Sequence, residues 1–154
     1  AYEAMECLGG NGVTEDFILA RLYRDAPINA IWEGSGNVQA LDMLRALGRS
    51  PEVLDTWYTE LAKTRGASPV LDAAVSSLQK ALQDLDEVEY RARRLVDQLA
   101  LTMQASLLLQ AGNEAVSDAF IASRLGQPGE RNYGTLPPGL NLEPILQRAN
   151  PRAS

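Results

Sequence analysis

The chain has 154 residues, 45% of them hydrophobic, and a formal net charge of −6, which suits one domain with a real core. It contains no histidine, so histidine bases, histidine metal ligands and Ser–His or Cys–His nucleophile pairs are excluded, and we expect no metal site. Its one cysteine, Cys7, cannot form an internal disulfide. We therefore expect a reducing, cytoplasmic location and a buried position for Cys7. The most apolar run, residues 99–109, is shorter than the roughly 18 residues of a membrane span.

Helical periodicity dominates the first third of the chain. Residues 1–8 predict a helix that starts without an entry turn, which indicates a piece of a longer protein. Turn residues follow at 9–12. Thr14 has the features of a helix N-cap because two acidic residues follow it, and this helix should run to about Tyr23. Apolar residues at every third position then predict a helix over residues 37–48.

Two serine–proline pairs predict the next two helix starts. Ser50 and Ser68 are each followed by a proline, which suits the first helical position. The first start predicts a helix to about residue 61. After the second, apolar residues recur in steps of three and four over residues 71–99, so we predict one long amphipathic helix packed in a bundle.

The C-terminal part should also be helical. Residues 99–109 are apolar on both faces and should be buried on all sides, and residues 113–124 and 141–149 should form two more helices. Residues 127–140 should form a loop between them. No segment alternates with a period of two, so we predict an all-α fold, a helical bundle with a long helical extension.

The first motif with chemical content is Gly9-Gly10-Asn11-Gly12, directly after a predicted helix. Glycines free backbone N–H groups and allow a ligand to approach closely, so the loop could cradle a phosphate. An ordinary glycine cap and turn would use the same residues. The spacing matches neither G-x-G-x-x-G nor a Walker loop, so neither nucleotide motif applies.

The second motif is Ile31-Trp32-Glu33-Gly34-Ser35-Gly36-Asn37. Glu33 lies between a large aromatic residue and a glycine in an otherwise apolar neighbourhood. Desolvation there would disfavour the charged carboxylate, which suits a general base near neutral pH. A solvent-facing glutamate that ends a helical turn, with Gly34 as its cap, is the alternative.

Taken together, the two motifs, with Leu-Tyr-Arg-Asp-Ala at residues 22–26 between them, resemble the C-terminal helical domain of acyl-CoA dehydrogenases over residues 1–48. Several features resemble the AidB-like (alkylation-response) branch of that family: the amino-acid sequence of residues 32–37, the long helical extension, and residues 119–125 and 133–137. The resemblance implies a flavin oxidoreductase that acts on an acyl-CoA thioester.

The resemblance also implies roles for individual residues. Glu33 would remove the α-proton while a β-hydride passes to FAD, and Trp32 would line the acyl pocket, where the family usually has tyrosine. Gly34, Ser35 and Asn37 would help to hold FAD. The remaining implied flavin contacts are Gly9 and Gly10, which would touch the FAD of a neighbouring subunit. Glu6 departs from the family's usual glutamine, and Arg24 and Asp25 could form a buried pair that sets the loop before Glu33.

The resemblance implies a homotetrameric parent protein in which residues 1–48 end the helical domain and residues 49–154 form an extension packed on it. The family's N-terminal helical and central β-domains, which supply most flavin and CoA contacts, are not in this chain, so the isolated piece should be inactive.

Two other functions stay open. A DNA-binding, alkylation-protective role would rely on arginines of the second half, although residues 88–154 carry seven basic and six acidic side chains, a poor balance for a phosphate track. The arginine candidates for DNA binding are Arg91, Arg93, Arg94, Arg124, Arg131, Arg148 and Arg152.

The second alternative function is a non-catalytic helical oligomerisation module.

Overall fold

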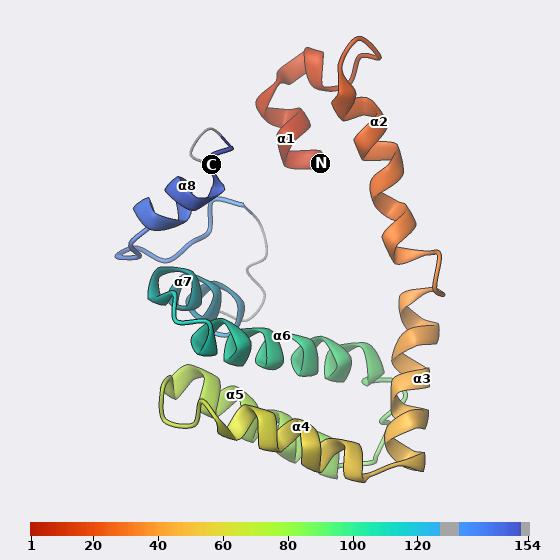
Figure 1. Cartoon of the computed structure of the whole chain (residues 1–154). Coiled ribbons are helices and arrows are strands. Elements are labelled where there is room, and N and C mark those ends of the chain that lie inside the picture. Colours follow the sequence, from red (N-terminus) through yellow and green to blue (C-terminus); the bar gives the residue numbers. More distant parts are fainter. Residues whose placement is uncertain (127–132, 152–154) are drawn as a thin grey trace. The chain divides into compact units, whose positions relative to one another are not determined.

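The computed structural model describes residues 1–126 and 133–151, and within these ranges it contains helices, turns and loops but no strands (Figure 1). The predicted all-α class is therefore confirmed. The chain divides into two compact units, Ala1–Asp42 and Met43–Ser154, each with its own internal packing. The predicted domain division after residue 48 stays a prediction.

Unit 1 is built from short elements. They are α1 (Tyr2–Cys7), the 3-10 helix η1 (Gly9–Gly12), α2 (Ile18–Asp25), the 3-10 helix η2 (Ala26–Ala30) and the first half of α3 (Gly36–Arg49). Gly12 is where η1 meets α1 most closely, because a Cβ there would lie 2.3 Å from the Met5 carbonyl oxygen. Buried residues are few and small, with Ala20 and Ala40 the buried apolar side chains. Cys7 is exposed, so its predicted burial is wrong: α1 has no buried residue at all.

The start of α2 differs from the prediction. Thr14 is not an N-cap, because the helix begins four residues later at Ile18 and Phe17 occupies the cap position. The intervening turn brings Glu15 to Arg24, which donates two hydrogen bonds of 2.6 and 3.0 Å to the carboxylate. In a continuous helix these residues would lie about 13 Å apart along the axis, so the pair requires the turn.

Unit 2 contains the large buried side chains. Its helices are the rest of α3, α4 (Glu52–Ala62), α5 (Pro69–Gln83), α6 (Ala92–Gln110), α7 (Glu114–Arg124) and α8 (Glu143–Ala149). In one core cluster Leu78 of α5 packs with Leu95 and Leu99 of α6, against apolar residues of α3 and α4. In the other, Leu71 and Ile121 pack on Ala105. Helix α6 is therefore the centre of the bundle, with α5 and α7 against it (Figure 1).

The single long helix predicted over residues 71–99 is wrong. Helix α5 ends at Gln83, and the chain turns before α6 begins at Ala92. The Asp84 carboxylate accepts a hydrogen bond from the Asp86 N–H, and this local bond favours a turn over continuation of the helix. Arg91 then donates to the carbonyls of Ala81, Asp84 and Asp86 at 3.3, 2.7 and 2.7 Å. One guanidinium thus satisfies the Ala81 carbonyl in the last turn of α5, which has no helical partner, and two carbonyls of the segment that follows.

The other helices agree with the prediction in place and differ in detail. Ser68 and Asn113 cap α5 and α7 through their side chains, whereas Ser50 contributes a carbonyl rather than a hydroxyl to the start of α4. The expectation that residues 99–109 are buried on all sides is wrong, since Leu107 is 49% exposed. Of the predicted loop, residues 133–140 contain no helix, and residues 127–132 lie outside the described ranges.

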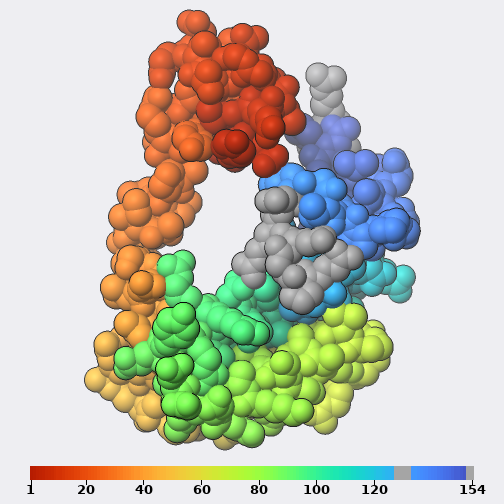
Figure 2. Space-filling view, turned by 180° about the vertical axis from the view of Figure 1, so that it is seen from behind, coloured from red at the N-terminus to blue at the C-terminus, as the bar shows by residue number. Residues whose placement is uncertain are grey.

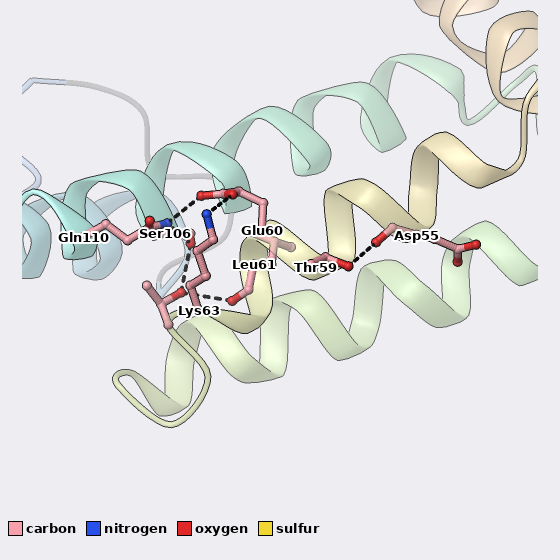
Figure 3. Close-up of polar contacts among 8 residues, drawn as sticks. Asp55, Thr59, Glu60, Leu61, Lys63, Ser106 and Gln110 are labelled. Atoms are coloured by element: carbon pink, nitrogen blue, oxygen red, sulfur yellow. Dashed lines mark hydrogen bonds and ion pairs between the residues drawn. The ribbon is translucent and has the colours of Figure 1, made fainter.

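A polar network crosses the interface between α4 and α6 (Figure 3). The buried hydroxyls of Thr64 and Ser106 are 2.9 Å apart, and Gln110 donates both to Ser106 and to the Glu60 carboxylate. Lys63 also binds Glu60, and the two partners lower the pKa of this carboxyl.

None of the helices described here is long and apolar enough to cross a membrane.

Candidate active site

The Glu33 turn connects η2 to α3, and backbone hydrogen bonds define it on its N-terminal side. The Trp32 N–H donates to the Ile28 carbonyl and the Gly34 N–H to the Ile31 carbonyl, both at 3.0 Å. Gly34 has a φ of +108°, a conformation that favours glycine and explains its place in the motif. Helix α3 starts immediately afterwards, and its first amides have no acceptor within the helix.

Glu33 itself is exposed in this chain. Its apolar neighbours are exposed as well, Ile31 by 62% and Trp32 by 65%. Figure 2 shows this stretch, in orange, as a narrow column of chain. The turn therefore brings a carboxylate and two large apolar side chains together at the surface of unit 1, and its own residues do not desolvate Glu33.

The other predicted flavin contacts are also at the surface. Gly9 has a φ of +57° at the end of α1, as expected for a glycine that caps a helix, and neither Gly9 nor Gly10 has an atom within 4 Å of an added Cβ. Ser35 and Asn37 are exposed at the start of α3. Gly34 is half-buried against Val38.

The structure does not bring the two motifs together. Helix α1 and η1 pack against each other and α1 against α2, and the chain then runs through α2 and η2 before it reaches the Glu33 turn (Figure 1). The expectation that the Gly9–Gly10 loop contacts the flavin of a neighbouring subunit stays a prediction.

The charged segment before η2 is arranged differently from the expectation. Arg24 and Asp25 do not form a buried pair: Arg24 binds Glu15, and Asp25 is 3.7 Å from Arg21, all at the surface. The Arg24 guanidinium lowers the pKa of Glu15 through its hydrogen bonds and charge, and Glu15 in turn raises the pKa of Arg24. Both pairs are confined to α2 and the turn before it, and neither includes Glu33.

Sequence reasoning missed one residue of the turn. The Gln39 side chain donates a 3.0 Å hydrogen bond to the Gly34 carbonyl, while its backbone N–H binds the Ser35 carbonyl at the same distance. Gln39 follows Gly34 by five residues, and this spacing predicts a contact only when the start of α3 is known. The reason is that a side chain in the first helical turn points back over the loop before the helix.

Comparison with known families identifies the family that the segment with these motifs resembles. Residues 1–48, which include η1, the Glu33 turn and most of α3, match the family model described as "Acyl-CoA dehydrogenase, C-terminal domain". This segment is a C-terminal domain of the acyl-CoA dehydrogenase family. The resemblance inferred from the sequence motifs is thereby confirmed.

Relatives of this acyl-CoA dehydrogenase domain match far beyond residue 48. The putative acyl-CoA dehydrogenase AidB of Escherichia coli is 36% identical over 127 residues, which are 82% of this chain and 23% of AidB. Acyl-CoA dehydrogenase family member 11 of Caenorhabditis elegans is 30% identical over 79% of this chain and 22% of its own length. The butyryl-CoA dehydrogenase of Syntrophomonas wolfei is 24% identical over 87% of this chain and 24% of its own length. The chain therefore spans about a quarter of the length of these relatives, and the AidB similarity includes the extension.

The described arginines considered for DNA binding lie on several elements of unit 2. Arg91 binds carbonyls of its own chain, and Arg124 and Arg148 lie on α7 and α8. Arg93 and Arg94 are exposed on the first turn of α6. Arg131 and Arg152 lie outside the described residues. No observation here favours a phosphate track.

Proposed function

We propose that the parent protein is an FAD-dependent acyl-CoA dehydrogenase and that Glu33 is the base that removes the α-proton of the acyl-CoA thioester. The observation that carries the proposal is the Glu33 turn: a carboxylate between a tryptophan and a positive-φ glycine, immediately before a helix, in a segment of this family. An α-proton is weakly acidic, so its removal requires a fixed and desolvated carboxylate.

The exposed apolar surface of unit 1 supports the desolvation of Glu33 in the parent protein. Monomeric soluble proteins rarely leave large contiguous apolar patches uncovered. In the longer relatives, further chain is available to cover such a surface, and we propose that it does so here and encloses Glu33. The exposed large apolar residues are Tyr2, Leu8, Val13, Phe17, Ile18, Leu22, Tyr23, Ile28, Ile31, Trp32, Val38 and Leu41.

The residues after Glu33 fit a flavin. The start of α3 supplies backbone N–H groups, and Ser35 and Asn37 supply a hydroxyl and an amide, which suit the acceptor atoms of FAD. Gly9 and Gly10 have open space where side chains would be, so a cofactor could approach their backbone. When bound, FAD supplies the acceptor for the hydride that leaves the β-carbon. Glu33 receives the proton, and the product is the α,β-unsaturated thioester.

The family suggests several further properties, which belong to the same proposal. We propose a homotetrameric, cytoplasmic parent in which Trp32 narrows the acyl pocket. Residues 1–48 would end the catalytic helical domain, and residues 49–154 would form its helical extension. Neither the DNA-binding role nor the purely oligomeric module gains a specific observation from the structure.

Anaerobic titration of the full-length parent tests the proposal. Its flavin absorbance is recorded while a panel of acyl-CoA thioesters of increasing chain length is added. We expect at least one thioester to bleach the flavin band of the wild-type protein, while Glu33→Gln retains its flavin and is reduced at least about a hundredfold more slowly. Asp16→Asn is the matched control, because Asp16 is an exposed acid of the same unit and lies outside the Glu33 turn. Bleaching in Glu33→Gln equal to the wild type would overturn the assignment of the base.

A further inference from the structure

We infer that Gln39 is a positioning residue for Glu33: its side-chain amide locks the Gly34 joint, so that the carboxylate is held in one orientation relative to α3. This inference rests on the proposed role of Glu33. It adds to the site a residue that is not acidic and follows Glu33 by six positions.

Gly34 is the flexible point of the turn. Its φ of +108° lies in a region that glycine enters at little cost, so the residue defines no unique direction by itself. The peptide on its N-terminal side is held by the Gly34 N–H bond to Ile31, and the preceding turn by the Trp32 N–H bond to Ile28. These bonds fix Glu33 to η2 and leave its orientation relative to α3 undetermined.

Gln39 fixes the other side of the joint. Its Nε2 donates to the Gly34 carbonyl at 3.0 Å, and its backbone N–H donates to the Ser35 carbonyl at 3.0 Å. One residue of the first turn of α3 therefore binds two successive carbonyls after Glu33. The predicted flavin-holding residues Ser35 and Asn37 belong to the same helix start, so the bond also sets the distance between the base and that surface.

The carbonyl bond distinguishes Gln39 from a generic exposed glutamine. Gln104 of α6 is also exposed and helical, and the structure records no bond for its side chain. Gln39→Met keeps the length of the side chain and removes the donor, and Gln104→Met makes the same change where no turn depends on it.

Single-turnover flavin reduction in the full-length parent tests the inference. For Gln39→Met we expect reduction about five- to tenfold slower, as loss of one orienting hydrogen bond predicts, with unchanged flavin content and thioester binding. Gln104→Met should reduce at the wild-type rate. In the double variant Glu33→Gln with Gln39→Met, flavin reduction should be no slower than in Glu33→Gln alone, because Gln39 acts through Glu33. A multiplicative loss in the double variant would indicate a general structural role and overturn the inference.

Amide hydrogen exchange provides a readout that does not depend on turnover. In Gln39→Met the Gly34 amide, which is bonded to the Ile31 carbonyl, should exchange about tenfold faster than in the wild type, and the amides of α6 should not change. The inference fails if Glu33→Gln abolishes reduction while Gln39→Met matches the wild type in both rate and exchange. If Glu33→Gln reduces normally, the proposed function fails first, and exchange alone then reports whether Gln39 locks the turn.

Discussion

Arg91 holds the turn between α5 and α6, and its replacement tests the division of residues 71–99 into two helices. The substitution Arg91→Met keeps much of the apolar stem and removes all three guanidinium–carbonyl bonds to Ala81, Asp84 and Asp86. It also removes an ion pair, since Arg91 lies 3.4 Å from the Asp84 carboxylate. The turn carbonyls must then find water or remain without partners.

The expected loss follows from the exposure of these groups. A hydrogen bond that involves a charged group contributes about 1.5–3 kcal/mol when water cannot replace it. The bond to Ala81 is partly buried, whereas the bonds to Asp84 and Asp86 are exposed. In the variant, water can therefore bind the Asp84 and Asp86 carbonyls and recover much of the free energy of those two bonds. The ion pair adds about 0.2–1 kcal/mol because the Asp84 side chain is 60% exposed. We therefore expect Arg91→Met to lower the free energy of unfolding by about 2–4 kcal/mol.

Urea denaturation followed by circular dichroism at 222 nm measures this loss. Arg94→Met is the matched control, because Arg94 is exposed on the same helical turn with no recorded partner, and its change should stay within about 0.5 kcal/mol. The m-value should remain the same in both variants if the native fold is kept. An equal loss in the two variants would refute the assignment of Arg91 as the anchor of the turn.

Three further predictions concern stability and charge. Leu78→Ala should lower the unfolding free energy by about 2–5 kcal/mol, because Leu78 is completely buried, whereas Leu85→Ala, at 74% exposure, should change it by less than about 0.5 kcal/mol in the same denaturation assay. Ser68→Ala should cost about 1 kcal/mol, since the Ser68 hydroxyl accepts the Leu71 N–H at the start of α5; a loss no larger than experimental error would contradict the cap. The pKa of Glu15 should be below its ordinary value in the wild type and should return toward it in Arg24→Met, as measured by carbon NMR titration of the carboxyl group. The lowered pKa means that this pair stabilises the fold above the unfolded carboxyl pKa, and that its contribution is lost as the pH falls through the lower folded value.

The helices were largely predictable because local signals define their ends. Ser68 and Pro69 mark the start of α5, and Asn113 marks that of α7, through contacts between near neighbours. The break between α5 and α6 was missed because both helices contribute to one core, with Leu78 on the first and Leu95 and Leu99 on the second. The apolar period therefore continues across the turn.

Other features depended on contacts that no local pattern encodes. The delayed start of α2 accompanies the Glu15–Arg24 pair, which joins residues nine positions apart. For the candidate site, the motif residues were found from the sequence, and Gln39 was not, because its role depends on the geometry of the first turn of α3. Burial of Glu33 could not be predicted from this chain, since it depends on what packs on the surface of unit 1.

Proton exchange at the α-carbon of the thioester tests the central assignment most directly, because it isolates the step given to Glu33 from the hydride transfer. The full-length parent is incubated in D₂O with a thioester that it binds, and deuterium at the α-carbon is measured by mass spectrometry. We predict rapid incorporation by the wild type and a loss of at least about a hundredfold in Glu33→Gln, the usual contribution of a general base. Equal incorporation by the two proteins would contradict the assignment of Glu33 as the base.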